Sequence, residues 1–440
     1  MTAPASLLLL IATLGAIASA PLGAATLAPA EIDKLARDGE KRIIEWRRDI
    51  HQHPELSNRE VRTAQKVEAH LRSLGLDVKA GIAHTGVVAV LKGGKPGPVI
   101  ALRADMDALP VTEKTDVPFK STATAEYRGE QVGVMHACGH DAHVAILMGA
   151  AQALVAMKAD LPGTILFIFQ PAEEGAPEGE TGGAKQMLAE GIFDIAKPEA
   201  TFGLHVTSSL HTGVLGYRSG PLMAGSDRFK VVVSGRQTHG ARPWQGVDPI
   251  VTAAQIVTSL QTVVSRQVDI TENPAIVTVG AIKGGIRHNI IPDEVQMLGT
   301  IRTFDRDQRT DILKRVERIV THTAEANGAT ATFTLGDDPN PVVYNNPELM
   351  QRVLPSLQRV VGADNVKILP LITGSEDFAY YAAKVPSVFF YVGITPPGEN
   401  LLTVPANHSP YFYIDETGLQ PGLRALLQVA VDYLNGKPRS

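Results

Sequence analysis

The chain has few cysteines, few aromatic residues and no excess of basic charge. Cys138 is the one cysteine among 440 residues, so a disulfide within the chain is excluded. The net charge of -5 and the lack of a basic patch exclude the electrostatic footprint of a nucleic-acid-binding protein, so no nucleic acid is expected as a partner. Hydrophobic residues make up 44% of the sequence, which is ordinary for a globular protein. A chain of this length exceeds one compact core, so two domains are expected.

The sequence also shows no apolar run long enough to span a membrane. The apolar run near the start covers residues 6–18, whereas a span takes about 20 apolar residues. The run leads into small residues near Ala20 and Ala25, which is the pattern of a cleaved export signal, although no lysine or arginine precedes it. We therefore expect residues 1–25 to be a signal peptide and the protein to be periplasmic or secreted. The alternative is a poorly ordered alanine-rich leader.

Four short apolar runs predict strands that are covered on both faces. They are GVVAVLKG (86–93), GPVIALRAD (97–105), GTILFIFQ (163–170) and ATFGLHV (200–206). We expect the first two runs to be neighbouring strands. Helices are predicted at 142–157 and 184–190, between some of these strands. Strands that alternate with helices in this way indicate an α/β fold, in which helices surround a sheet.

From about residue 224 the pattern changes. An alternating strand is followed by a long helix, two strands around a turn, a helix at 306–326 and a further strand. This order is a βαββαβ-like unit. We therefore expect a small α+β domain at 224–335, inserted between two parts of a larger domain at 26–223 and 336–440.

Polar residues stand at the ends of three predicted strands. Asp105 and Asp107 end one run, Glu173 and Glu174 another, and His205 a third. Ligands of open α/β sheets bind beyond the carboxyl ends of the strands, so we expect these side chains at one rim.

The segment MHACGHDAH (135–143) carries Cys138 and His140 two residues apart. On an extended backbone both side chains point the same way, and thiolate and imidazole are good ligands for a borderline-soft divalent metal. Asp141 then suits the N-cap of the helix that follows. The alternative is a buried thiol beside a helix cap and a surface histidine. The residue types alone leave both interpretations open.

The remaining candidates are ambiguous when each is taken alone. Adjacent glutamates such as Glu173 and Glu174 usually mark a solvated turn, but beside a metal one can ligate while the other acts as general base. His205 by itself fits a hydrogen-bonded core histidine, and His408 fits an ordinary Pro-rich loop.

Nine segments occur in an order and spacing that closely resemble the M20 metallopeptidase family. They are WRRDIHQHPELSNRE, ALRADMDALPV, MHACGHDAHVA, QPAEEG, GLHV, THGARP, RHNIIPDEV, GSEDFA and NHSP. The chain most resembles the amidohydrolase branch, with its hippurate, N-acyl-amino-acid and auxin-conjugate hydrolases. The resemblance covers nearly the whole chain after the leader. It implies a zinc-peptidase-like α/β catalytic domain with helices around a mixed sheet, an inserted lid or dimerisation domain, and a homo-oligomer, dimer or higher.

The same resemblance implies the site. Two divalent metal ions per subunit are expected, zinc or manganese, with cobalt or nickel also possible. The implied metal ligands are Cys138, His140, Glu174, His205 and His408. Glu173 would be the general base, and Asp107 would orient a ligand imidazole.

In the inserted domain, the resemblance implies that His239, Asn289 and Arg302 contact the substrate carboxylate or the developing oxyanion, with His239 coming from a neighbouring subunit. Glu376 of GSEDFA would line the site. One departure is visible: relatives run from AEEG through a short glycine stretch, whereas this chain has APEGETGG at 176–183. That insertion concerns specificity, because Glu173 and Glu174 stay in place.

The expected reaction is hydrolysis of the amide bond of N-acyl amino acids, aromatic or hydrophobic, by a metal-activated water with Glu173 as general base. Ochratoxin-like conjugates of phenylalanine fall within this range of small-molecule substrates. One alternative is a dipeptidase or aminopeptidase of the same family, which needs a free amino group on its substrate. A more distant alternative is a non-catalytic periplasmic binding protein.

Overall fold

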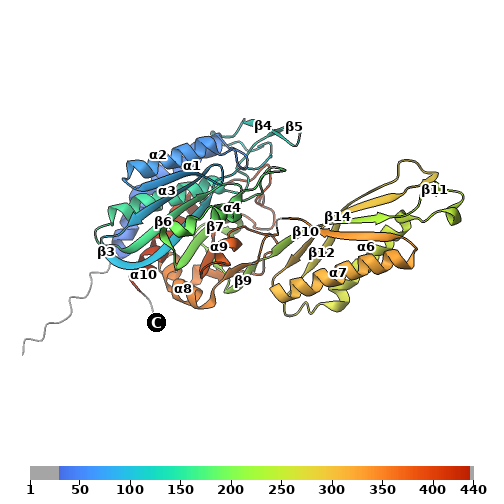
Figure 1. The fold of residues 1–440 in the computed structure, drawn as a ribbon. Helices are drawn as coiled ribbons and strands as arrows, with labels where there is room; N and C mark the ends of the chain where they lie inside the picture. The colour runs from blue at the N-terminus through green and yellow to red at the C-terminus, as the bar shows by residue number, and fades with distance from the viewer. Residues whose placement is uncertain (1–28, 338, 437–440) are drawn as a thin grey trace, which may run out of the picture.

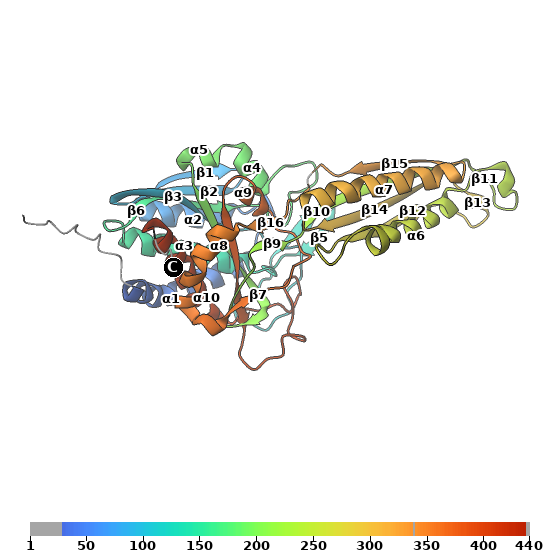
Figure 2. The same cartoon turned by 90° about the horizontal axis from the view of Figure 1, so that it is seen from below.

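The structure is a computed structural model that describes residues 29–337 and 339–436. The expected signal peptide, residues 1–25, lies outside the described residues. Figures 1 and 2 show a large α/β part and an arm that projects from it, each built around its own sheet. Within the described ranges, no helix is both long and apolar enough to cross a membrane.

The large part is organised by an eight-stranded sheet. Its order is β1 (Asp77–Ile82), β2 (Gly86–Lys92), β6 (Pro162–Gln170), β3 (Lys95–Asp105), β7 (Ala200–His211), β18 (Ser387–Thr395), β8 (Leu215–Tyr217) and β17 (Val366–Ile368). The central strands β6, β3, β7 and β18 run parallel. β6 and β18 are buried almost without a break, because helices cover both faces of the sheet.

The expectation that residues 86–93 and 97–105 form neighbouring strands is wrong, because β6 lies between β2 and β3. β2 pairs antiparallel with β6, whereas β3 pairs parallel with it. The connection between β2 and β3 crosses the segment that leads into β6. A Cβ on Gly93 would lie 2.2 Å from the carbonyl oxygen of Leu161, and Gly94 meets the same segment as closely. The missing Cβ atoms of the two glycines therefore allow the β2–β3 connection to pass close to the segment that leads into β6, although β6 comes later in the sequence.

Helices form a layer on each face of this sheet. One layer contains α1 (Pro29–Gln52), α2 (Val61–Ser73), α3 (His140–Ala156), α8 (Pro347–Val361) and α10 (Leu419–Leu434), and the other contains α4 (Gly183–Ala189), α5 (Ile192–Ala196) and α9 (Ala379–Ala382). Helix α3 packs against both α1 and α10 and is buried nearly all round, which explains why its sequence is apolar on every side.

The arm has an antiparallel sheet with two helices on one face. The sheet order is β12 (Ile276–Gly284), β14 (Glu294–Thr303), β10 (Gly225–Ser234) and β15 (Thr330–Leu335), and the helices are α6 (Pro249–Gln267) and α7 (Arg306–Ala326). These helices and the sheet share an apolar core of their own. Asp248 and Asp305 cap α6 and α7 by accepting hydrogen bonds from backbone N–H groups. The short pair β11 (Thr238–His239) and β13 (Ile290–Ile291) lies at the far end of the arm (Figure 1).

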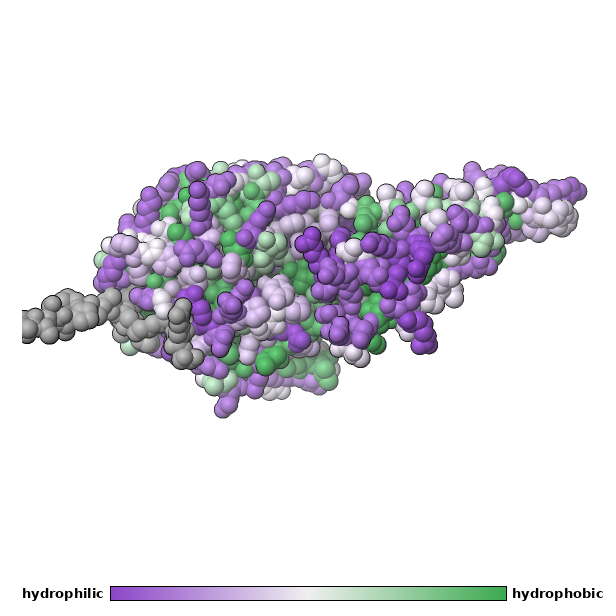
Figure 3. All heavy atoms as spheres, turned by 60° about the horizontal axis from the view of Figure 1, so that its bottom comes forward, coloured by the Kyte–Doolittle hydropathy of each residue, from purple (hydrophilic) through white to green (hydrophobic). Residues whose placement is uncertain are grey.

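Two small ladders complete the structure. At the junction, β9 (Gly220–Met223) leads into the arm and pairs antiparallel with β16 (Val343–Asn345) on the way back. A hairpin of β4 (Thr124–Tyr127) and β5 (Glu130–Gly133) lies at the upper edge of the large part in Figure 1, whereas β9 lies at its lower edge. In the face seen in Figure 3, apolar residues form small patches interrupted by hydrophilic ones.

Candidate metal centre

The carboxyl ends of the parallel strands β6, β3 and β7 meet at one edge of the large sheet. Asp105 ends β3, Glu173 and Glu174 follow β6, and His205 lies on β7. The segment before α3 brings Cys138 to the same edge. The polar strand ends therefore gather at one rim, as the sequence predicts.

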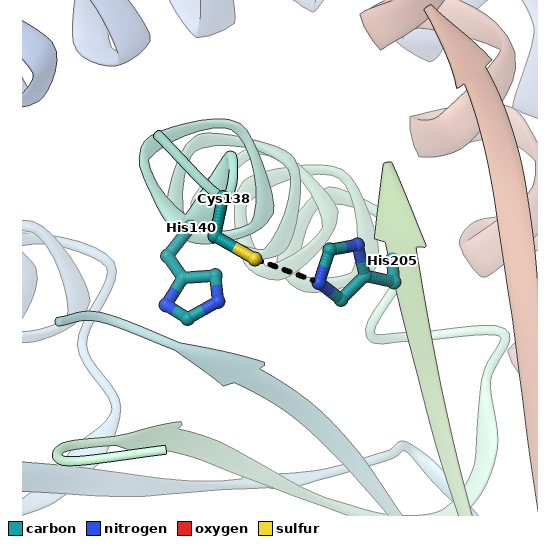
Figure 4. Close-up of side chains that lie close together, drawn as sticks. All are labelled: Cys138, His140 and His205. Carbon is teal, nitrogen blue, oxygen red and sulfur yellow. Dashed lines mark hydrogen bonds between the residues drawn. The ribbon is translucent and has the colours of Figure 1, made fainter. Parts of the chain in front are cut away.

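Cys138 lies at the centre of this rim. Its Sγ is 3.3 Å from Nε2 of His205 and 3.3 Å from Nε2 of His408, and the latter nitrogen is 3.2 Å from Oε1 of Glu174. Figure 4 shows Cys138 and His140 at the start of α3, with His205 reaching toward the thiol from β7. Five groups of three side chains have possible ligand atoms that all lie within 4.8 Å of one another: Cys138–His140–His205, Cys138–Glu174–His408, His140–Glu173–Glu174, Asp105–His140–His143 and Glu173–Glu376–Asp377. These groups overlap, so the side chains form one continuous cluster.

Two imidazoles of the cluster, when neutral, can turn an Nε2 lone pair toward its centre. Nδ1 of His140 lies 3.2 Å from Oδ1 of Asp107, and Nδ1 of His205 lies 2.6 Å from the carbonyl oxygen of Val206. A proton on each Nδ1 makes both bonds and leaves each Nε2 as an acceptor. Nε2 of His140 is buried and has no hydrogen-bond partner among the described residues. Such tethering of one ring nitrogen is typical of metal-ligating histidines, so these residues fit a metal.

The ionisable groups of the cluster also fit a bound metal. Burial, and after it repulsion from Glu376 and Glu174, raises the pKa of Glu173 well above its usual range. Burial and the neighbouring Glu174 and Glu173 also raise the pKa of the Cys138 thiol well above its usual range. Bound divalent cations would offset this repulsion and favour the ionised thiolate and carboxylates. The donor set therefore suits divalent cations better than it suits a site without them.

The turn that carries Cys138 and His140 is not extended, and Asp141 is not a helix cap. Gly139 adopts a left-handed φ of 102° and itself precedes the first residue of α3, without a side-chain cap. A Cβ at Gly139 would lie 2.3 Å from Cγ2 of Val206, so the turn requires glycine. Because the helix begins at His140, Asp141 falls in its first turn, where negative charge is favourable.

Asp141 is instead part of a buried ion pair. It lies 2.8 Å from Nε of Arg47 and 2.8 Å from Nδ1 of His51, both on α1. The interaction with Arg47 and His51 holds the pKa of the Asp141 carboxyl below its usual range in spite of burial. This pair fixes the start of α3, and with it the candidate ligand loop, against α1.

His136, His140 and His143, which flank Cys138 in the sequence, are all buried, so the alternative of a surface histidine in this segment is wrong. His143 contacts Oδ1 of Asp105 through Nδ1 at 2.5 Å and accepts a hydrogen bond from the Val206 backbone N–H at Nε2. Both ring nitrogens are thus used. His143 joins α3 to the ends of β3 and β7 and has no lone pair left for a metal.

Sequence reasoning missed the role of Arg103, which is fully buried beneath the cluster. Its guanidinium lies 2.7 Å from Asp105, 2.9 Å from Glu376 and 2.9 Å from Asp377. Three carboxylates around one cation fix the GSEDFA loop under Glu173, which accepts a long 3.4 Å hydrogen bond from the Asp377 backbone N–H. The role of Arg103 could have been predicted from its spacing to Asp105 in ALRADMDALPV, because residues two apart on a strand lie on the same side of it.

Asn407 was also missed, although it precedes His408 directly. Its side-chain amide donates to the carbonyl oxygens of Cys138, at 2.8 Å, and of Val206, at 3.2 Å. His408 itself has a left-handed φ of 72°, and its N–H donates to the Ala137 carbonyl oxygen at 2.7 Å. These bonds hold His408 against the cysteine loop.

The structure brings only one of the three arm candidates to the cluster. Arg302 lies where the arm joins the large part and lines the same cavity as Cys138. His239 on β11, and Asn289 beside β13, lie at the far end of the arm (Figure 1). Within one chain, His239 and Asn289 therefore do not meet the other candidates.

A cavity of about 530 Å³ opens over the cluster. Its polar wall includes Cys138, Glu173, Glu174, His205, His408, Arg302 and Glu376, and its apolar wall includes Leu210, Met223, Leu369, Pro370, Ile372 and Tyr391. Residues 176–180 and Gly182, which belong to the departure from the family pattern, instead line a neighbouring cavity of about 370 Å³. The insertion thus lies beside the cluster and leaves it intact.

Comparison with known proteins identifies this arrangement. The profile of Peptidase family M20/M25/M40 matches residues 101–432, which is most of the chain. The chain belongs to this family. The resemblance seen in the sequence is therefore confirmed.

The M20 relatives cover nearly the whole chain. Thermostable carboxypeptidase 1 of Saccharolobus solfataricus is 40% identical over 92% of this chain and 99% of its own length. N-acetylcysteine deacetylase of Bacillus subtilis is 37% identical over 89% of this chain and 96% of its own length. Among solved structures, a Bacillus subtilis dinuclear metal-binding peptidase of the M20 family is 34% identical, covers 90% of this chain and 99% of its own, and superposes with a TM-score of 0.76.

These likenesses confirm the α/β fold and the enzyme class. The protein is a metal-dependent amidohydrolase of the M20 family. The alternative of a non-catalytic binding protein does not fit this membership. The reaction's finer details depend on the residues around the cluster.

Proposed function

We propose that the protein hydrolyses the amide bond of N-acyl amino acids whose acyl group is aromatic or otherwise hydrophobic, including ochratoxin-like conjugates of phenylalanine. One observation carries the proposal: the cavity that the candidate metal cluster lines is also lined by apolar side chains such as Leu210, Leu369 and Ile372. An apolar acyl group fits against these side chains while its amide carbonyl lies over the cluster. Arg302, on the same cavity, offers a guanidinium to the carboxylate of the amino acid.

Cys138, His140, Glu174, His205 and His408 would hold two divalent ions, zinc or manganese, with cobalt or nickel as further candidates. Bound ions supply Lewis-acid polarisation of the carbonyl and lower the pKa of water. Asp107 keeps Nε2 of His140 aimed at the cluster through its contact with Nδ1.

Glu173 is the proposed general base. Its carboxylate lies 3.9 Å from Nε2 of His140, at the edge of the cluster, and its backbone N–H donates to Asp107. In that position Glu173 can take a proton from the attacking water and pass it to the leaving amine. Glu376, held by Arg103, contributes a third carboxylate to the wall of the cavity, besides those of Glu173 and Glu174.

We further propose that His239 and Asn289 act in the site of a neighbouring subunit, within a dimer or larger homo-oligomer. Their position at the far end of the arm, away from the cluster of their own chain, supports this arrangement. Residues 224–335 would then serve as both lid and dimerisation domain, between catalytic segments 26–223 and 336–440. The apolar leader at residues 1–25 supports export to the periplasm or beyond.

A second candidate is a peptidase of the same family. It is favoured by the 34% identity to a dinuclear metal-binding peptidase of the M20 family. The two candidates differ in the substrate's amino end, which is acylated in one case and free in the other.

The test is hydrolysis by chelator-stripped protein before and after addition of zinc or manganese. The panel contains hippurate, N-acetyl-phenylalanine, ochratoxin A and the dipeptide Phe-Ala. We expect metal-dependent release of the amino acid from the acylated compounds. Cleavage of Phe-Ala alone would favour the peptidase, and cleavage that persists without metal would contradict the proposal.

A further inference from the structure

The second cavity, of about 370 Å³, shares part of its wall with the cavity over the cluster. Glu173, Glu174, Arg302 and Ser375 line both. An amide bond held at the cluster therefore has one substituent facing each cavity. The first cavity is largely apolar beyond the cluster, whereas the second, which we call the polar chamber, is lined almost entirely by polar and charged groups.

Two guanidiniums enter the polar chamber from one face of the arm sheet. In the β10–β14 ladder, Arg302 lies opposite Ser226 and Arg228 lies opposite Thr300. Arg228 and Arg302 are thus diagonal neighbours on the same face, a spacing of roughly 7–8 Å between backbones that long side chains can bridge. Both line the chamber.

Among the described residues, neither guanidinium forms an ion pair. Nη1 of Arg302 is buried without a hydrogen-bond partner, and across residues 29–337 and 339–436 the Arg228 side chain makes no hydrogen bond or ion pair. Asp227 stands between Ser226 and Arg228 on β10, so its side chain points to the opposite face of the sheet, where Arg309 binds it twice. Burial, and then the nearness of Arg228, lowers the pKa of Arg302. Two like charges without a carboxylate between them form a site for anions.

The carboxylates of the chamber do not neutralise this pair. Glu173 and Glu174 belong to the candidate metal cluster. Glu180 is bound by Arg59 at 2.6 Å, and Asp377 is bound by Arg103. Glu178 is exposed at the rim. Arg128 and Lys185 add further positive charge to the wall.

We propose that the polar chamber receives the amino-acid half of the substrate, and that Arg228 selects a side chain bearing a second carboxylate, as in N-acyl-aspartate or N-acyl-glutamate. The inference rests on the proposed function, because that function puts an amide bond at the cluster. Arg302 takes the α-carboxylate, and Arg228 is then the cation left for the side chain. Arg228 is a specificity-determining residue, and the chemical step is the same for every substrate.

The test compares two substrates of the same shape, N-benzoyl-glutamate and N-benzoyl-glutamine, by their kcat/KM. The wild type should favour the glutamate by about tenfold or more, the scale of a hydrogen bond to a charged group. Arg228→Gln should bring the ratio close to one. Lys230→Gln is the matched control, because Lys230 is exposed, lies two residues further along the same face of β10 and is outside the chamber wall; its ratio should equal that of the wild type.

A wild-type ratio near one, or a ratio that Arg228→Gln leaves unchanged, would overturn the inference. A binding measurement separates this failure from failure of the proposed function. Metal-loaded Glu173→Gln is titrated with both benzoyl compounds by calorimetry. Tighter binding of the glutamate without turnover of either compound by the wild type would refute the proposed reaction and support the chamber. Equal affinities for the two compounds would refute the proposed selection of a second carboxylate by the polar chamber.

Discussion

Asp107 connects the candidate metal ligands to the candidate base, and its replacement is the sharpest structural test of the site. Its Oδ1 lies 3.2 Å from Nδ1 of His140 and 3.1 Å from the Glu173 backbone N. Its Oδ2 lies 3.0 Å from the Glu174 backbone N and 2.8 Å from Oγ of Ser57. One buried carboxylate therefore accepts hydrogen bonds from four donors.

Asp107→Asn keeps the shape but turns one acceptor oxygen into an NH₂ donor. Whichever way the amide is oriented, it faces the backbone N–H of Glu173 or Glu174 with a second donor. Loss of an acceptor for one buried donor costs about 1–3 kcal/mol. Loss of the negative charge beside His140 should also weaken metal binding by about 10- to 100-fold, the usual effect of removing the partner of a ligating histidine.

The assay is competition for zinc against a colorimetric chelator, with urea unfolding of the metal-free protein alongside. Ser57→Ala is the graded control. It removes one of the four bonds, so it should cost about 1 kcal/mol and leave zinc affinity nearly unchanged. If Asp107→Asn binds zinc as tightly as the wild type, the reasoning that this carboxylate organises the site is refuted.

Three further predictions concern stability. Burial and the nearby Asp107 raise the pKa of Glu60 to about 8, so its stabilising contribution is complete below the unfolded value of about 4.5 and is lost as the pH rises through 8. Glu60→Gln should therefore be more stable than the wild type in urea above pH 8 and similar to it near pH 5; parallel pH profiles would contradict this. Asp141→Asn removes one of the two carboxylates that pair with the buried Arg47, because Glu416 remains 3.2 Å away, and should cost about 1–3 kcal/mol in urea unfolding at pH 7, whereas a loss below about 0.5 kcal/mol would show that the pair is unimportant. Removal of metal by a chelator should lower the Tm, because an ion present at 100 times its Kd contributes about 2.7 kcal/mol, and added zinc should restore it. An unchanged Tm would count against a metal at this cluster.

The polar rim of the large sheet could be predicted because each apolar run ends at a polar residue, which marks the carboxyl end of a strand. The acidic and histidine residues after β3, β6 and β7 are visible in the sequence, and parallel pairing brings them together. Strand order was less accessible, since β6 separates β2 from β3 although it follows them by many residues. The one related feature of the sequence is the glycine pair at 93 and 94, which allows the β2–β3 connection to pass close to the segment before β6.

Partnerships across long separations could not be predicted. Arg103 meets Glu376 across 273 residues, and Arg47 meets Asp141 across 94. Neither pair has a periodic or spacing signal. The misplaced cap at Asp141 has a local cause instead: Gly139 enters the left-handed region and starts the helix earlier than the charge pattern suggests. Likewise, a role for Arg228 in the site could not be predicted, because only the β10–β14 register shows that it lies beside Arg302.

The central claim is that metal ions at the Cys138 cluster and the Glu173 carboxylate together hydrolyse an amide. The most direct measurement is metal content and hippurate hydrolysis of Glu173→Gln, alongside the wild type, both reloaded with zinc. We predict two ions per chain in both proteins and a loss of about 10²–10⁴-fold in kcat for the variant, the range of general acid–base catalysis. A variant that binds both ions and retains wild-type kcat would contradict the account.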